Sequence, residues 1–348
     1  RCVTRIMRSG MTKRQLTKHQ RARIQTNQDR ALNISSAPPH DKNIDPSASL
    51  APPSIGRVIC NFGRQIDIEG LEDDYRGHTY RCHKRAHVEP LVAGDEVIWQ
   101  HAEPYGVVTA RKPRRSELVR PDIYGKIRPV AANVDRIAIV LACTPEPFSN
   151  LIDRYLAAAE VQGIQAILLA NKIDLEDHPN MAKVVALIEA YEHIGYTVLR
   201  VSAEKKIGIN QLHQQLCEHT SIFVGQSGVG KSSLINHLQP TAKTAVGEMS
   251  LGAEKGVHTT TASRLFHLPT GGRLIDSPGI REFSLSHLRP EQLLSGFVDF
   301  HPHLGHCKFR DCSHRHEPQC ALLAAVAQKQ LSAERLKNYH QIVDSQET

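Results

Sequence analysis

The sequence lacks any apolar run long enough to span a membrane. A bilayer-crossing helix needs about 18 or more consecutive apolar residues, and no stretch of the 348 residues approaches that length. The basic N-terminal segment has neither an apolar core nor a small-residue cleavage site, so we expect no secretory signal. Both absences favour a soluble protein with no membrane partner.

The eight cysteines are not spread through the chain as a disulfide framework would require. Three of them lie between Cys307 and Cys320, and the others are scattered. Disulfide-stabilised domains are small and secreted, with cysteines at regular spacings. The pattern instead indicates one metal site in a reducing compartment, so we expect a cytoplasmic location.

Length and charge set further bounds. A chain of 348 residues predicts two or three domains. Hydrophobic residues make up 40% and charged residues 23%, as in ordinary globular proteins. The net charge of +7 favours a polyanionic partner.

Residues 1–54 predict a basic and disordered N-terminal tail. Nine Lys or Arg residues stand against a single acid, Asp29, in the first 30 residues, and a stretch rich in Pro, Ser and Ala follows at 35–54. Such a composition buries too little apolar surface to order itself. An RNA-contacting tail and a merely solvated tail are both open.

Residues 55–115 predict a small β-barrel of the OB type. Five short alternating segments are separated by turn residues, and this number of strands in some 60 residues suits such a barrel. The segments are 56–60, 65–68, 79–82, 95–99 and 105–108. A nucleic-acid face could use Tyr75 and Tyr80 with the basic residues Arg76, Arg81, Lys84 and Arg85. For any one of these residues, we favour a solvated barrel surface.

Residues 134 to about 283 alternate between strand and helix patterns, as in an open α/β sheet, and we assign residues 116–290 to this domain. They contain the phosphate-loop pattern G-x-x-x-x-G-K-S between a buried strand and an amphipathic helix. Glycines let backbone N–H groups surround the phosphates, the lysine neutralises their charge, and the serine hydroxyl binds Mg²⁺. The predicted nucleotide contacts here are Gly225, Gln226, Ser227, Gly228, Val229, Gly230, Lys231, Ser232 and Ser233.

A guanine-reading pattern, N-K-x-D, directly follows a predicted strand at 164–170. The Asp174 carboxylate can accept two N–H donors that guanine has and adenine lacks. Asn171 would hold the loop or contact the base edge, and the Lys172 stem would cover the base. Ser202 and Ala203 close the next strand and complete this predicted base site.

The remaining predicted contacts surround the γ-phosphate and Mg²⁺. Thr260, with Thr259 as the alternative, would place a hydroxyl on Mg²⁺. Asp276 would bind Mg²⁺ through water, and the Gly279 N–H would contact the γ-phosphate. Because the base-reading patterns precede the phosphate loop, the reverse of the usual GTPase order, we predict a circularly permuted domain.

Residues 291–348 predict a mainly helical, zinc-binding domain. Cys307, Cys312, His314 and Cys320 supply three thiolates and an imidazole, which suit a closed tetrahedral zinc site. His316 is an alternative ligand on the same loop. One helix is predicted at 321–342, with Lys329, Arg335 and Lys337 exposed.

These motifs together resemble the small-ribosomal-subunit-dependent GTPase A family (RsgA, also called YjeQ), over about residues 11–348. The resemblance implies an OB-fold, a permuted GTPase domain and a zinc domain that grip the small (30S) ribosomal subunit and its 16S rRNA during late maturation. It implies slow intrinsic hydrolysis that the subunit stimulates. Because the segment after Gly279 leads into the zinc domain, we expect the subunit to be bound in the GTP state and released in the GDP state, when loss of the γ-phosphate re-aims that domain. We expect a monomer. The family pattern does not account for the stretch at 35–54.

The candidate catalytic group is predicted because the usual water-orienting glutamine is absent. Ile280 stands where a Ras-like enzyme has the glutamine that orients water, so intrinsic hydrolysis should be weak. His258, in the loop before the threonine run, is the candidate for positioning this water, with Lys231 as the charge partner of the phosphates. An RNA-binding assembly factor with a structural nucleotide, and a signalling GTPase with a protein partner, are the competing interpretations.

Overall fold

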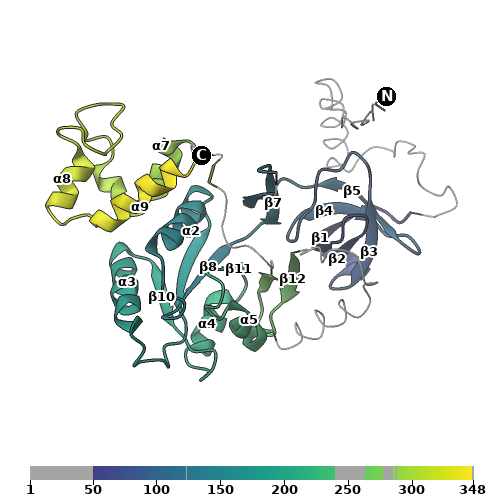
Figure 1. The fold of residues 1–348 in the computed structure, drawn as a ribbon. Helices are drawn as coiled ribbons and strands as arrows, with labels where there is room; N and C mark the ends of the chain where they lie inside the picture. The colour runs from purple at the N-terminus through teal and green to yellow at the C-terminus, as the bar shows by residue number, and fades with distance from the viewer. Residues whose placement is uncertain (1–49, 123, 240–262, 277–284, 287, 347–348) are drawn as a thin grey trace, which may run out of the picture.

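The computed structural model describes residues 50–122, 124–239, 263–276, 285–286 and 288–346. Figure 1 shows a β-barrel, a central α/β region and a helical C-terminal region that follow one another along the chain. Most of the predicted tail at 1–54 lies outside the described residues. None of the described helices is long and apolar enough to cross a membrane.

The first region is a closed five-stranded barrel, so the predicted OB-type architecture is confirmed. Neighbouring strands run in the order β1-β2-β3-β5-β4, and pairing of β1 with β4 closes the barrel. Val58, Ile68 and Trp99 are fully buried in its interior. The strands are β1 (Ser54–Asn61), β2 (Ile66–Gly70), β3 (Thr79–Lys84), β4 (Glu96–Gln100) and β5 (Gly106–Arg111), with the short helix η1 (Asp73–Tyr75) after β2.

The two barrel tyrosines pack on the barrel itself. The rings of Tyr75 and Tyr80 lie 5.7 Å apart, and they lie 5.4 Å and 4.9 Å from the buried Trp99 ring. Arg81 forms an ion pair with Asp67 of the neighbouring strand. Tyr75, Tyr80 and Arg81 are therefore engaged in barrel packing and pairing.

A β-hairpin that was not predicted lies between the barrel and the central sheet. It consists of β6 (Glu117–Pro121) and β7 (Ile127–Ala132). Its turn is closed by Asp122, whose carboxylate accepts hydrogen bonds from the backbone N–H groups of Tyr124 and Lys126. Leu118 and Ala131 bury the hairpin against the core of the central region.

The central sheet has the strand order β10-β9-β8-β11-β13-β12. Neighbouring strands in this sheet are parallel, except that β12 pairs antiparallel with β13. The strand β12 was not predicted. A single residue pair, Cys60 and Arg264, continues the sheet from β12 into the barrel. The strands are β8 (Arg136–Leu141), β9 (Gln165–Ala170), β10 (Thr197–Arg200), β11 (Thr220–Val224), β12 (Arg264–His267) and β13 (Arg273–Asp276).

Helices cover both faces of this sheet because strand side chains alternate between the faces. Ile139 and Leu168 point into the core beneath α2 and α3, whereas Val140 and Leu169 point into the core beneath α4 and α5. The helices are α2 (Ser149–Val161), α3 (Met181–Ile194), α4 (Ile209–Leu216) and α5 (Lys231–Leu238). A sheet covered on both faces leaves its strand ends as the open sites, as in other α/β folds.

The C-terminal region contains two helices where one was predicted. Lys329 adopts a left-handed conformation (φ 59°) and interrupts the chain, and the Ser332 hydroxyl then caps the next helix by accepting from the Arg335 N–H. The prediction of one continuous helix over 321–342 is therefore wrong. The elements are α7 (Pro290–Ser295), η2 (Val298–His303), α8 (Ala321–Ala327) and α9 (Ala333–Asp344).

The predicted exposure of Arg335 is also wrong. Its side chain is only 6% exposed and pairs with Asp153 of α2 and Asp299 of η2. Asp153 is itself fully buried and also accepts from Tyr191 Oη (2.5 Å) and Asn338 Nδ2 (2.7 Å). Although burial alone lowers the pKa of Arg335, the two carboxylates raise it above its usual value. This buried cluster joins α9 to the central region.

Candidate nucleotide site and metal centre

The phosphate loop begins where the buried strand β11 ends. β11 lies between β8 and β13, and all five of its residues are buried. The loop then leads directly into the N-terminus of α5, where free backbone N–H groups favour an anion. The predicted strand, loop and helix are therefore present.

Two loop positions require glycine for lack of space as well as for conformation. Gly225 has φ 137°, and a Cβ there would lie 2.2 Å from the Val140 carbonyl oxygen. Gly230 has φ 97°, and a Cβ there would lie 2.2 Å from Asn171 Nδ2. Side chains at either position would push the loop away from the guanine-reading segment.

Lys231 lies folded over the loop. Its ammonium donates to the carbonyl oxygens of Gly225 (2.7 Å) and Gln226 (2.6 Å), which places positive charge inside the ring of backbone groups. Ser232 and Ser233 follow on the exposed side of the first turn of α5. The ammonium of Lys231 and the two exposed serines therefore belong to the loop and to the first turn of the helix that follows it.

Asn171 joins the guanine-reading segment to the phosphate loop. It follows β9, is 2% exposed, and donates from Nδ2 to the Val229 carbonyl oxygen at 2.8 Å. Its Oδ1 accepts from the Ala203 N–H at 3.2 Å. Of the two roles predicted for Asn171, these bonds support holding the loop.

Lys172 and Asp174 shape the base side of the site. Lys172 has φ 61° and donates from Nζ to the carbonyl oxygens of Thr144 (2.9 Å) and Gly228 (2.8 Å). Ser202 donates its hydroxyl to Asp174 and accepts from the Lys205 N–H. The Ser202 hydroxyl therefore holds one oxygen of Asp174 in place at the base side of the site.

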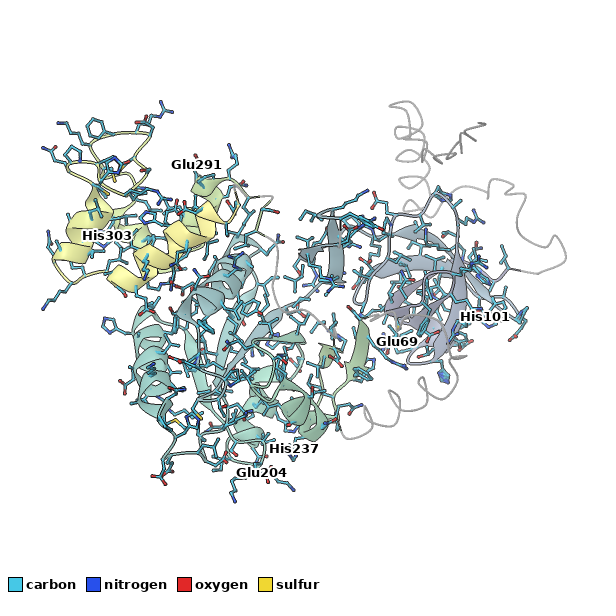
Figure 2. The ribbon with its side chains drawn as sticks, in the orientation of Figure 1. Glu69, His101, Glu204, His237, Glu291 and His303 are labelled. Atoms are coloured by element: carbon cyan, nitrogen blue, oxygen red, sulfur yellow. The ribbon has the colours of Figure 1, made fainter. Side chains whose placement is uncertain are left out.

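These segments enclose a cavity of about 500 Å³ between the loop after β9 and α5. Its lining contains the predicted Asn171, Lys172, Asp174, Ala203, Gly230 and Ser233, together with Leu175, Glu204, Asn236 and His237, which were not predicted. Figure 2 labels Glu204 and His237, which lie close together at this end of the central region. Asn236 and His237 fall three and four residues after Ser233, on the same helix face, and this spacing was the available signal.

Asp276 stands at the end of β13, beside β11. Burial raises the pKa of its carboxyl group. Of the other residues predicted near the γ-phosphate, Thr259, Thr260, His258, Gly279 and Ile280 lie outside the described residues.

The four predicted metal ligands come together in the C-terminal region. The ligand atoms of Cys307, Cys312, His314 and Cys320 all lie within 4.8 Å of one another. His314 Nδ1 lies 3.5 Å from Cys307 Sγ and 3.4 Å from Cys320 Sγ, and these two sulfurs lie 3.9 Å apart. Exposed His316 does not belong to the cluster, so His314 is the histidine that joins it.

This geometry suits a metal such as zinc. Zinc–sulfur bonds of about 2.3 Å in a tetrahedron separate two sulfurs by about 3.8 Å, close to the 3.9 Å observed between Cys307 and Cys320. His314 and Cys320 are buried, which fits a closed structural site without a water ligand. A bound ion would supply the cross-link that this loop, poor in apolar residues, otherwise lacks.

Comparison with known proteins agrees with this arrangement. The family described as RsgA GTPase matches residues 111–286. Proteins named small ribosomal subunit biogenesis GTPase RsgA, from Ectopseudomonas mendocina (strain ymp) and Azotobacter vinelandii (strain DJ), are each 49% identical over 337 residues. Each alignment covers 96% of this chain and 98% of the relative.

Two solved structures are similar at 28% sequence identity. YjeQ from Thermotoga maritima has a TM-score of 0.69, with 84% of this chain and 98% of that chain covered. YloQ, described as a circularly permuted GTPase, has a TM-score of 0.65, with 89% and 98% covered. Here too the base-reading segment precedes the phosphate loop within one sheet, which confirms the predicted permutation. The chain therefore belongs to the RsgA GTPase family and is a GTP hydrolase.

Proposed function

We propose that this enzyme acts in late maturation of the small (30S) ribosomal subunit. It binds the subunit and its 16S rRNA in the GTP state, hydrolyses GTP when the subunit stimulates it, and leaves in the GDP state. The names of the relatives support the partner, as does the net charge of +7. The carrying observation is the single cavity in which Asp174 and the phosphate loop meet.

The proposed residue roles follow the geometry of that cavity and of the phosphate loop beside it. Asp174 reads the base, Asn171 fixes the two loops to each other, and Lys231 neutralises phosphate charge. Ser232, Asp276 and Thr260 are proposed to hold Mg²⁺, which supplies charge neutralisation between the β- and γ-phosphates. The contacts of Ser202, Ala203 and Gly279 complete the proposed site.

The organisation that goes with this function is also a proposal. We divide the chain into a tail (1–54), a barrel (55–115), the permuted GTPase domain (116–290) and a zinc domain (291–348). Zinc would hold the zinc domain through the Cys₃His cluster. A cytoplasmic monomer is the proposed working form.

The decisive assay is turnover of GTP and ATP with and without purified small subunits. We expect a large stimulation that is specific for GTP and is abolished by Lys231→Ala. A subunit without effect would overturn the ribosomal assignment and leave the GTPase itself intact. If the folded Lys231→Ala protein still promoted subunit maturation, the nucleotide would have only a structural role.

The catalytic role of His258 has its own test. His258→Ala should abolish the stimulated rate and leave GTP affinity nearly unchanged, because a water-positioning group acts mainly in the transition state. An unchanged stimulated rate would exclude the role. Equal subunit affinity in the GTP-like and GDP states would exclude release by hydrolysis.

A further inference from the structure

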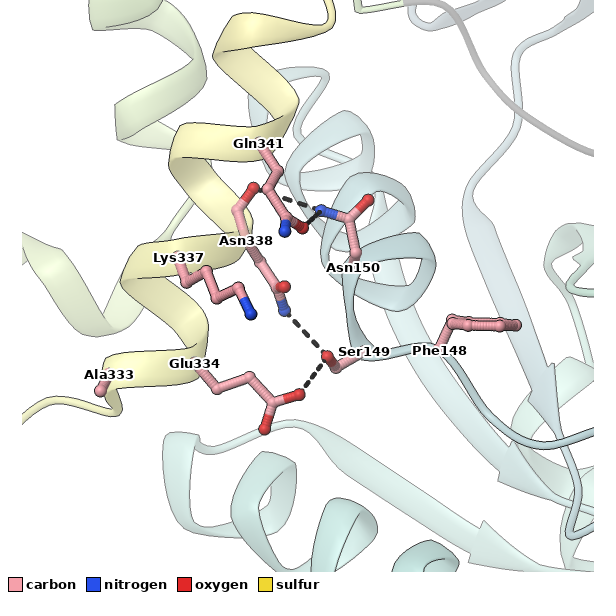
Figure 3. A pocket seen from close by; sticks show the side chains of 8 residues that line it. All are labelled: Phe148, Ser149, Asn150, Ala333, Glu334, Lys337, Asn338 and Gln341. Atoms are coloured by element: carbon pink, nitrogen blue, oxygen red, sulfur yellow. Dashed lines mark hydrogen bonds between the residues drawn. The ribbon is translucent and has the colours of Figure 1, made fainter.

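A groove separates the start of α2 from α9, at the junction of the central and C-terminal regions. It encloses about 400 Å³ and is lined from one side by Phe148, Ser149 and Asn150, and from the other mainly by Glu334, Asn338 and Gln341. Figure 3 shows the hydrogen bonds that cross it. Phe148 lies on the side away from α9 in this view.

The first residues of α2 are bonded directly to α9. The Ser149 hydroxyl donates to Glu334 (2.5 Å) and accepts from Asn338 Nδ2 (3.0 Å). Asn150 Nδ2 donates to the Asn338 carbonyl oxygen (3.3 Å) and to Gln341 Oε1 (3.1 Å). Because Asn338 also bonds the buried Asp153, α9 fixes the first turn of α2 at several points.

The loop that leads into α2 is bonded at its other end to the nucleotide site. The Thr144 carbonyl oxygen accepts from Lys172 Nζ, which also donates to Gly228 of the phosphate loop. Further along, Phe148 lines a narrow space together with Gly225 and Gln226 of the phosphate loop. The same short loop, residues 144–148, is therefore bonded to the base side of the site and borders a narrow space with the phosphate loop.

We propose that Ser149 and Asn338 are positioning residues for nucleotide binding. By holding the start of α2, α9 keeps the Thr144 carbonyl where it fixes the ammonium of Lys172, and with it the lysine stem that would cover the base. This inference rests on the proposed role of Lys172 in the nucleotide site. Binding linkage is reciprocal, so a bound nucleotide strengthens the docking of α9 by the same factor.

The test is the affinity of the full-length, metal-loaded protein for a fluorescent GDP analogue. Ser149→Ala and Asn338→Ala should each weaken binding about three- to tenfold, the size expected for loss of one or two bridging hydrogen bonds. Turnover at saturating GTP should stay unchanged, because the loop acts on binding. Ser149→Thr, which retains the hydroxyl, should restore most of the affinity.

Lys337→Ala is the matched control, because Lys337 lines the same groove and makes no hydrogen bond to α2 among the described residues. Affinities of the Ser149 and Asn338 variants equal to that of Lys337→Ala would overturn the inference. Should Asn338→Ala fail to fold, Ser149→Ala alone decides it. Amide hydrogen exchange provides an independent measurement: GDP should slow exchange in α9, and unchanged exchange would also overturn the inference.

These measurements need no ribosome, so they separate the inference from the proposed function. A protein that binds GDP through α9-dependent contacts but is not stimulated by subunits would retain the inference and lose the partner. If Lys172→Ala left GDP affinity unchanged, the proposed base site itself would be wrong. The inference about α9 would then fail as well, because it depends on the role of Lys172.

Discussion

We predict that Arg335→Met destabilises the docking of α9 by about 3 kcal/mol, near the lower end of the range for breaking a buried ion pair. The reason is that the substitution leaves the buried carboxylate of Asp153 unpaired. Asp153 is fully buried, and removal of Arg335 takes away the cation that pairs with its carboxylate. Methionine conserves much of the aliphatic volume, so the loss reports mainly on charge.

Two features keep the expected cost from being larger. Asp153 retains two donors, Tyr191 Oη at 2.5 Å and Asn338 Nδ2 at 2.7 Å. Burial already raises the pKa of Asp153, and losing Arg335 raises it further, so the acid can take up a proton. A raised folded-state pKa makes the variant relatively more stable at low pH. The destabilisation should therefore grow as pH rises.

The assay is amide hydrogen exchange in α9, which reports local opening separately from the barrel and the central sheet. The double variant Asp153→Asn, Arg335→Met removes both charges of the fully buried pair, and the Asp299 that remains is 13% exposed in side chain. This variant should recover more than half of the loss. Lys337→Met, on the exposed face of the same helix, should change the opening free energy by less than about 0.5 kcal/mol. A cost below about 1 kcal/mol for Arg335→Met would refute the uncompensated-charge reasoning.

Three further changes test other parts of the structure. Burial alone raises the pKa of Glu69, but its interactions with His267 and nearby arginines lower the pKa overall. Glu69→Gln should therefore destabilise the barrel by about 1 kcal/mol at neutral pH. Trp99 fluorescence follows the unfolding of the barrel. This difference should disappear as pH falls below the ordinary carboxyl value of 4.5 and through the lowered folded value. Cys320→Ser should lower the bound zinc measured by elemental analysis, and a chelator should unfold the C-terminal loop. Asp174→Asn should weaken GTP binding at least about tenfold in a competition assay and leave ATP binding weak.

Matched variants give each of these results its meaning. Glu103 is 88% exposed in side chain and serves as the control for Glu69. Cys217 lies outside the metal cluster, so Cys217→Ser should keep the full zinc content. A pH-independent loss in Glu69→Gln, equal zinc in both cysteine variants, or unchanged GTP affinity in Asp174→Asn would each contradict the assigned contact.

Local patterns were sufficient to predict most of the nucleotide site. Gly225 and Gly230 adopt conformations that favour glycine, so their identity carries structural information by itself. Asn171 directly follows β9 and Asp276 ends β13, and the carboxyl ends of these parallel strands lie at one edge of the sheet, so strand ends were the signal for both residues. The metal cluster could also be predicted from the sequence, because its ligands lie within one stretch of 14 residues.

Three features were missed by the sequence analysis: the burial of Arg335, the strand β12 and the break at Lys329. Arg335 lies 182 residues from Asp153, and a helical pattern around it gives no sign of that partner. The strand β12 has only four residues and gains its identity from pairing with β13. The break at Lys329 likewise depends on a left-handed conformation that lysine rarely adopts. Pairing with another segment decides the first two features, and a local left-handed turn decides the third.

The C-terminal region is connected to the proposed nucleotide site by two routes, one along the chain and one through space. Along the chain, Asp276 on the proposed γ-phosphate side leads through residues 277–284 to α7. Through space, α9 reaches the base side by way of Ser149 and the Thr144 carbonyl. GTP and GDP share the base and differ at the γ-phosphate. The contact through α9 should therefore change affinity for both nucleotides equally, whereas changes in 277–284 should alter their ratio. Measuring both affinities in Ser149→Ala would distinguish these routes: an altered GTP-to-GDP ratio would show that they are not independent.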